Sequence, residues 1–270
     1  MNFHPGSPAG RLGPRREGGA SVAHRDFDWV IDRLACVDST QTHARGRPSW
    51  SVVVAREQTA GRGQAARTFT SDPGGLYLTA VLPYAGDALA SRGFALAVGW
   101  ALCETLRELG VKRLRLRWPN DLMIEARKVG GILIEQGGAD TLLVGVGLNV
   151  TNRPWCVEPA LEAIAGRLVD AVQGGTLPDH AKMVKLVLRA VQTAHDVFAL
   201  RRLAGFVPIL NATWGEPRAV EIEPAAGVPL QWVRGRFCGI DAGGALVVET
   251  ASGERQAIPA HHVGRLRELD

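Results

Sequence analysis

The sequence predicts a mixed α and β fold, and three observations support this. Short apolar runs typical of strands alternate with helical stretches from Trp29 to about residue 204. After Ala204-Gly205 only short strands follow, separated by Gly, Pro and Asp turns, as in a small β-barrel. Hydrophobic residues make up 46% and charged residues 21% of the 270, which is typical of a globular chain.

In the first region, we expect three helices and five strands. A helix over Asp87–Gly110 has apolar residues at helical spacing and stops at a glycine suited to a helix end. The other two predicted helices are Glu158–Val172 and His180–Leu200. The predicted strands are Trp50–Gln58, Leu76–Pro83 and Leu114–Trp118, with a hairpin of Lys128–Gln136 and Thr141–Val150 around Gly137-Gly138.

The second region is predicted to be all β, with a tight turn at Asp241–Gly244. Trp214 and Trp232 are expected in its core. Its predicted strands are Ala219–Ile222, Leu230–Ile240, Ala245–Thr250, Glu254–Ile258 and Val263–Arg267.

The formal net charge of +4 is concentrated at the start of the chain. The first 25 residues hold four arginines and one glutamate, so the remainder is nearly neutral. A nearly neutral body lacks the basic face that binding to a nucleic-acid backbone requires. Residues 1–24 are rich in Gly, Pro and Arg, and we expect a disordered leader. Without a signal peptide or membrane-length apolar stretch, a cytoplasmic protein is expected.

Metal sites of the zinc-ribbon type are excluded by cysteine spacing. The four cysteines contain no CxxC pair, so we expect reduced, mostly buried thiols. No histidine has the spacing of a transition-metal ligand set.

Two motifs hold a charged residue, one between two glycines and the other just after a predicted strand. In Ala60–Arg67, two glycines flank Arg62, so backbone amides can approach an anion while the guanidinium adds a charged fork. A glycine-rich hairpin with solvated arginines is the alternative. In Arg117–Asp121, an amide beside a carboxylate suits magnesium or a ribose hydroxyl, although Pro-Asn-Asp also favours a plain turn.

Three further motifs lie on predicted strands or at their ends. Lys128 precedes Gly130-Gly131 in an apolar strand, which indicates close approach of a ligand or a β-bulge. Gly145–Val150 is a strand of glycine and aliphatic residues that ends near an amide. In Asp38–Gln41, a hydroxyl residue suits a helix N-cap, which can coexist with ligand binding.

In their order and spacing, these five motifs resemble the biotin protein ligase family over about residues 30–152. The tail from Asn211 is similar to the SH3-like C-terminal domain of that family. The resemblance implies an α+β fold: a mixed-sheet catalytic domain over residues 25–204, after the leader, and an SH3-like β-barrel over 205–270.

The resemblance also implies a two-step reaction. Biotin and MgATP give biotinyl-5′-AMP and pyrophosphate, and the mixed anhydride then acylates one lysine of a biotin carboxyl carrier protein. Because the first step brings two anions together, cations must neutralise them. Arg62, Lys128 and Asp121 are the candidate catalytic residues, and Asn120 and Asp121 the candidate magnesium ligands.

Family motifs further imply the binding residues. A buried neutral urea needs neutral donors and acceptors, which the biotin residues include. The biotin set is Ser39, Thr40, Gln41, Gln58, Arg62, Gly63, Gln64, Lys128, Gly130 and Gly131. The set for ATP and the adenylate is Gly61, Arg62, Arg67, Phe69, Asn120, Lys128 and Asn149.

The sequence departs from the family in one loop. Where that loop often reads GRGRRGR, Gln64 replaces a cation and Ala66 a glycine. We therefore hypothesise that the adenylate is held less tightly and that some escapes. About 28 residues precede the first core strand, too few for the DNA-binding winged helix of many members, so a monofunctional ligase without DNA or membrane binding is expected.

Two other functions stay open from the sequence. One is a lipoate or octanoate ligase of the same superfamily, and the other is a non-catalytic sensor of biotin or its adenylate. The strand Thr141–Val150 could also lie at an exposed sheet edge and pair two copies of the chain as a homodimer.

Overall fold

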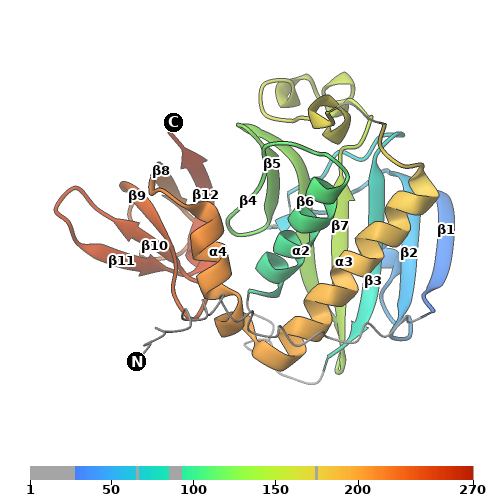
Figure 1. Ribbon diagram of the computed structural model, residues 1–270, viewed down its shortest axis with the longest axis horizontal. Helices are drawn as coiled ribbons and strands as arrows, with labels where there is room; N and C mark the ends of the chain where they lie inside the picture. Colours follow the sequence, from blue (N-terminus) through green and yellow to red (C-terminus); the bar gives the residue numbers. More distant parts are fainter. Residues whose placement is uncertain (1–27, 65–66, 85–92, 174–175, 270) are drawn as a thin grey trace, which may run out of the picture.

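The computed structural model describes residues 28–64, 67–84, 93–173 and 176–269, and its larger part is built on a seven-stranded mixed sheet (Figure 1). The strand order is β1-β2-β3-β7-β6-β5-β4, with β1 and β2 parallel and all other neighbours antiparallel. The strands are β1 (Val30–Val37), β2 (Ser51–Gln58), β3 (Leu76–Pro83), β4 (Leu114–Arg117), β5 (Asp121–Ile124), β6 (Arg127–Gly138) and β7 (Thr141–Leu148). The predicted leader, Ala66 and the start of the helix predicted from Asp87 lie outside the described residues.

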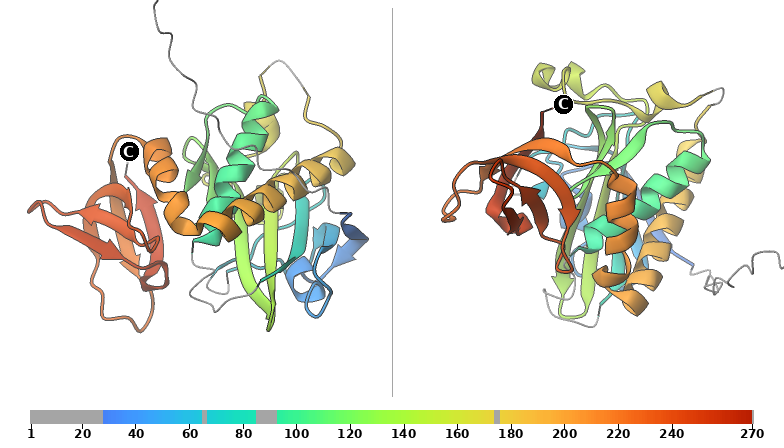
Figure 2. Two further views of the ribbon diagram at one scale, coloured as in Figure 1. Left: turned by 60° about the horizontal axis from the view of Figure 1, so that its bottom comes forward. Right: turned by 60° about the vertical axis from the view of Figure 1, so that its left-hand side comes forward.

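Two long helices, α2 (Phe94–Glu108) and α3 (His180–Arg201), cover one face of this sheet (Figures 1 and 2). Successive side chains of a strand point to opposite faces, so alternate residues of β3 and β7 pack against the helices. Leu78 and Val146 belong to that core. The intervening residues face the other way, toward the short helix α1 (Thr40–His43). Function-bearing side chains therefore gather on the face that the long helices leave open.

The helix predicted over Glu158–Val172 is wrong. This segment consists of turns and the short 3-10 helices η3 (Pro159–Leu161) and η4 (Leu168–Ala171), preceded by η2 (Pro154–Cys156). Its backbone bonds to the sheet instead: Gly166 N donates to Lys128 O, and Leu168 N donates to Asn149 O. Because the sheet satisfies these backbone groups, the segment needs no helix.

The expected edge position of Thr141–Val150 is also wrong. β7 lies between β3 and β6 and is hydrogen-bonded on both sides, which leaves no free edge for a second copy. The edges of the sheet are β1 and β4.

The C-terminal region begins with a helix that the sequence pattern did not reveal, α4 (Val207–Trp214). An antiparallel sheet of order β11-β10-β9-β8-β12 follows, and its two edge strands do not pair with each other within the described residues. Its strands are β8 (Arg218–Pro224), β9 (Val233–Ile240), β10 (Leu246–Glu249), β11 (Arg255–Ile258) and β12 (Val263–Glu268).

Two expectations about burial need correction. Trp214 is buried as predicted, but Trp232 is 55% exposed. Of the four thiols, which are all free, only Cys103 is buried, and Cys36 and Cys156 are exposed. No helix in the described part of the chain is long and apolar enough to cross a membrane.

Hydrogen bonds join the two regions where β4 meets α4 and the C-terminal sheet. The indole of Trp118 donates to Gly244 O at 3.0 Å, and the indole of Trp214 donates to Leu116 O at 2.6 Å. On the C-terminal side, Asn211 of α4 bonds both backbone groups of Ile240, at 3.0 and 2.9 Å. α4 is thereby fixed to both sheets.

Replacing Asn211 by Ala is expected to lower the free energy of unfolding by about 1–3 kcal/mol, because it leaves backbone groups of Ile240 without their side-chain partner. Chemical denaturation measures this value. Thr213→Ala is the matched control on the same helix, where an exposed hydroxyl bonds only Ile209 O, and it is expected within about 0.5 kcal/mol of wild type. Equal values for the two variants would contradict the prediction.

Candidate active site

A cavity of about 140 Å³ lies on the open face of the sheet, against β6 and β7. Glycines make the room for it. A Cβ atom at Gly145 would lie 2.6 Å from Gln41 Oε1, and one at Gly147 would lie 2.7 Å from the ring of Phe69. Both distances are too short for real contacts, so no other residue fits at these two positions without a shift. We call this cavity the small chamber.

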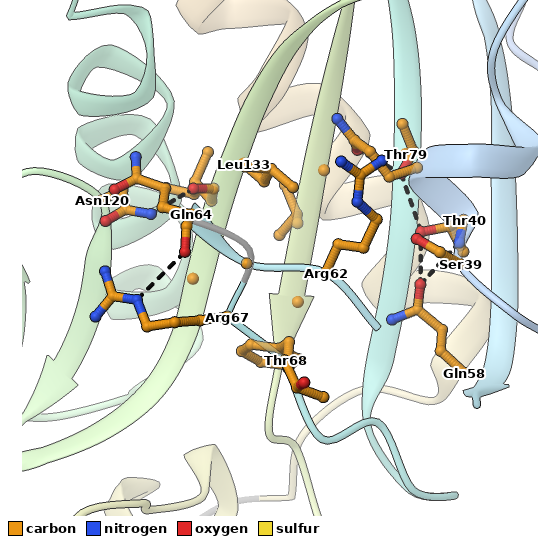
Figure 3. Close-up of a pocket in the computed structure, with 18 of the residues that line it drawn as sticks. Ser39, Thr40, Gln58, Arg62, Gln64, Arg67, Thr68, Thr79, Asn120 and Leu133 are labelled. Carbon is orange, nitrogen blue, oxygen red and sulfur yellow. Dashed lines mark hydrogen bonds between the residues drawn. The ribbon is translucent and has the colours of Figure 1, made fainter. Parts of the chain in front are cut away.

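Neutral polar side chains form one end of the small chamber (Figure 3). Thr40 donates to Gln58 Oε1 from its backbone nitrogen at 2.8 Å and from its hydroxyl at 3.0 Å. Gln58 Nε2 donates to Ser71 Oγ at 2.8 Å, which in turn donates to Phe69 O. Gln58 therefore fixes Thr40 and the loop that carries Phe69 by hydrogen bonds, in addition to lining the chamber.

Thr79 completes this end and was missed in the sequence. Its hydroxyl is fully buried on β3, 2.9 Å from Thr40 Oγ1 and 3.1 Å from Gln41 Oε1. It orients two predicted ligand-binding residues at once. The available signal was a threonine among the aliphatic residues of the strand Leu76–Pro83.

Ser39 is the polar residue here that lacks a partner. It occupies the N-cap position of α1, but its hydroxyl makes no capping bond. The Oγ atom is buried and has no hydrogen-bond partner among the described residues, and Ser39 lines the small chamber. A buried hydroxyl without a partner costs free energy, which a polar ligand group in the chamber would recover.

Lys128 stands at the opposite end of the small chamber. Its Nζ lies 2.5 Å from Asp121 Oδ1 and 5.9 Å from the centre of the Phe69 ring. Asp121 also accepts from Arg117 at 2.6 Å. Burial alone would raise the pKa of Asp121, but the charges of Lys128 and Arg117 outweigh it and hold the pKa below its ordinary value. Asp121 therefore stays ionised and fixes Lys128.

The Gly130-Gly131 pair after Lys128 lies at a β-bulge, and one of its two glycines also faces the small chamber. Register shifts between β5 and β6 at this point, so a bulge is present. Gly131 lines the small chamber, and a Cβ there would lie 3.3 Å from the Lys128 ammonium. Gly130 instead packs against Leu148, with 2.7 Å between its Cβ position and a methyl group.

Arg62 is not beside Lys128. It extends toward Thr79 at the neutral end (Figure 3), and its guanidinium pairs with Glu135 at 2.8 Å. Lys128 Nζ lies near Gly131, and Glu135 is four residues farther along β6. The backbone positions beside Lys128 Nζ and at Glu135 are therefore about 13 Å apart along the strand. The structure therefore gives the two predicted catalytic cations separate ends of the chamber.

The magnesium set at Asn120 and Asp121 stays a prediction, and both side chains already have protein partners. Asn120 Nδ2 donates to Ile132 O at 2.6 Å, and the Asp121 carboxylate is shared by two cations. Among the described residues, no three His, Cys, Asp or Glu side chains gather as a metal site. Magnesium commonly arrives on phosphate oxygens, with few protein ligands, so MgATP as a substrate needs no such site.

The Lys128 end opens into a second cavity of about 1170 Å³, the large chamber, formed between the seven-stranded sheet and the C-terminal sheet. The residues shared by the two chambers are Gln64, Arg67, Thr68, Phe69, Asn120, Asp121 and Lys128. The large chamber has more cationic than acidic side chains in its lining: Arg67, Arg115, Arg117, Lys128, Arg218, Arg265 and Arg267 against Asp121, Glu125, Glu158 and Glu268. This charge favours an anionic ligand such as a phosphate ester.

Asn149 lines only the large chamber, and its amide also has a structural use. Nδ2 donates to Gly166 O at 3.1 Å and so holds the segment after β7. Gly63 and Gln64 line the small chamber, whereas Gly61 is tightly enclosed by the backbone of Phe69.

Comparison with known proteins points to one family. The model of the biotin/lipoate A/B protein ligase family matches residues 34–150. A biotin--[acetyl-CoA-carboxylase] ligase of Paracoccus denitrificans is 33% identical over 254 residues, which cover 85% of this chain and 98% of that protein. The bifunctional ligase/repressor BirA of Escherichia coli K12 is 30% identical over 183 residues, 64% of this chain and 56% of BirA.

Solved structures agree with the sequences. The biotin protein ligase from Aquifex aeolicus in complex with biotin and ATP superposes with a TM-score of 0.75 at 25% identity, covering 88% of this chain and 99% of that one. The chain therefore belongs to the biotin/lipoate A/B protein ligase family, and within it to the biotin protein ligases.

Proposed function

We propose that the small chamber binds biotin and the large chamber binds MgATP, so that this ligase forms biotinyl-5′-AMP where they join. One observation carries the assignment: a neutral, polar, glycine-floored chamber opens at Lys128 into an arginine-rich chamber. A ligand with a neutral head and an anionic tail fits the first, and a nucleotide fits the second.

At the neutral end, the ureido group of biotin would bond Ser39, Thr40 and Gln41. Ser39 has a buried hydroxyl without a partner, and Thr79 and Gln58 hold the other two in place. A buried urea paired with neutral groups avoids the cost of burying a charge.

At the junction, Lys128 would hold the biotin carboxylate beside the α-phosphate. The carboxylate oxygen attacks phosphorus, the new bond forms the mixed anhydride, and the bond to pyrophosphate breaks. Lys128 reduces the repulsion between the two anions, and its ion pair with Asp121 fixes it before the substrates bind. No enzyme nucleophile is needed.

In the second step, the ε-amine of a lysine on a biotin carboxyl carrier protein would attack the acyl carbon and release AMP. We assign Gly61, Arg67, Phe69, Asn120 and Asn149 to the ATP and adenylate side. Arg67, Phe69, Asn120 and Asn149 line the large chamber, which supports this for four of the five.

We further propose residues 25–204 as the catalytic unit and 205–270 as an accessory unit of the SH3-like type. The five-stranded antiparallel sheet supports the second assignment.

Incubation with biotin, MgATP and an apo carrier domain is expected to add one biotinyl group to the carrier, detected by intact mass. Lys128→Gln should slow adenylation by about 10²–10³-fold through lost charge stabilisation, while the exposed Lys112→Gln serves as the matched control. Transfer of lipoate instead of biotin, or no pyrophosphate release at all, would contradict the proposed function.

Gln64→Arg is expected to slow release of biotinyl-AMP about tenfold, because Gln64 lines both chambers and an arginine there would add a charged bond to the phosphate. The measurement is free adenylate after rapid filtration of enzyme loaded without carrier. Gln64→Glu is the opposite-charge comparison and should release faster than wild type. Equal release by wild type and Gln64→Arg would refute the hypothesis of a weakly held adenylate.

Thr79→Val removes one buried hydroxyl with little change in volume, and we expect about a tenfold higher KM for biotin with an unchanged KM for ATP. Steady-state pyrophosphate release gives both constants. Thr213→Val, at an exposed site on α4, should match wild type. A rise in the KM for ATP alone would show that Thr79 does not serve the biotin end.

A further inference from the structure

Glu135 lies outside both chambers yet contacts two segments that form the walls of the small chamber. Its carboxylate is 2.8 Å from Arg62 Nη2 through one oxygen and 2.8 Å from Arg45 Nη2 through the other. Arg45 also donates to Gln136 O at 3.3 Å, so it is attached to β6 at two points.

The two arginines belong to different walls. Arg62 lies in the loop after β2, which also carries Gly63 and Gln64 into the small chamber. Arg45 lies two residues after α1, whose residues Thr40 and Gln41 form the neutral end. One carboxylate on β6 thus joins the loop and α1 to the sheet.

This arrangement assigns Arg62 a place at the biotin end. Glu135, the partner of Arg62, is four residues or about 13 Å along β6 from Gly131, the residue beside the Lys128 ammonium, so Arg62 is paired away from the Lys128 end. An arginine held there covers the neutral end and does not neutralise the reacting phosphate.

We propose that Glu135, with Arg45, is a positioning residue that holds Arg62 over the biotin end of the small chamber and so slows the escape of biotin. The inference rests on the proposed function, because it takes biotin as the occupant. Glu135 acts through Arg62 and touches no substrate.

The test compares Glu135→Gln, Arg62→Gln and the double variant of the full chain by biotin dissociation rate and by KM. These side chains are 21–44% exposed, so the expected effect is about a fivefold faster dissociation and a matching rise in the KM for biotin. In Glu135→Gln, which keeps Arg62, the KM for ATP and kcat should not change. In the Arg62→Gln background, Glu135→Gln should add little further effect on Arg62-dependent binding.

Glu249→Gln is the matched control, because Glu249 pairs with Arg255 in the C-terminal sheet at a similar exposure of 27%. Unchanged biotin dissociation in Glu135→Gln, or a higher KM for ATP in Arg62→Gln, would overturn the inference. The second result would mean that Arg62 leaves Glu135 to meet the phosphate.

A measurement without ligand separates this inference from the proposed function. Hydrogen exchange of the amides of Arg62, Gly63 and Phe69 should be faster in Glu135→Gln than in wild type, since the loop loses its link to β6. Wild-type protein that fails to bind biotin would overturn the proposed function, and unchanged exchange would overturn the link itself.

Discussion

The pocket depends on the absence of side chains along two adjacent strands. Gly131 on β6 and Gly145 and Gly147 on β7 floor the small chamber, while the alternate residues of the same strands pack against α2 and α3. A Cβ at Gly145 or Gly147 would meet Gln41 or Phe69 at under 3 Å. The missing side chains of these glycines therefore make room for Gln41 at the polar end, for the Phe69 ring and for the small chamber.

On this floor, charge is separated into two ends. Asp121 holds Lys128 where the two chambers join, and Glu135, about 13 Å along β6 from Gly131, holds Arg62. Each cation is paired with a protein carboxylate, so neither depends on a ligand for its position. The neutral hydroxyl and amide groups of Thr40 and Thr79 and their partners lie at the second end.

The sequence predicted most strands because their apolar residues are short runs bounded by Gly and Pro, and it predicted α3 from helical spacing. It failed where backbone groups bond to distant elements. The segment Glu158–Val172 has helix-compatible residues, but its amides bond to the ends of β6 and β7. The position of β7 inside the sheet could not be predicted either, because strand order depends on crossovers that leave no local pattern.

For the site, the order and spacing of five motifs were enough to predict a biotin protein ligase. They also named most of the residues that line the small chamber, but only a minority of those that line the large chamber. Which partners those residues contact could be seen only in the folded structure. Thr79 forms hydrogen bonds with Thr40 and Gln41. Asp121 pairs with Lys128 and Arg117. Arg62 pairs with Glu135. The physical reason is that these roles depend on hydrogen bonds and ion pairs between residues far apart in the chain, which become neighbours only when the sheet forms.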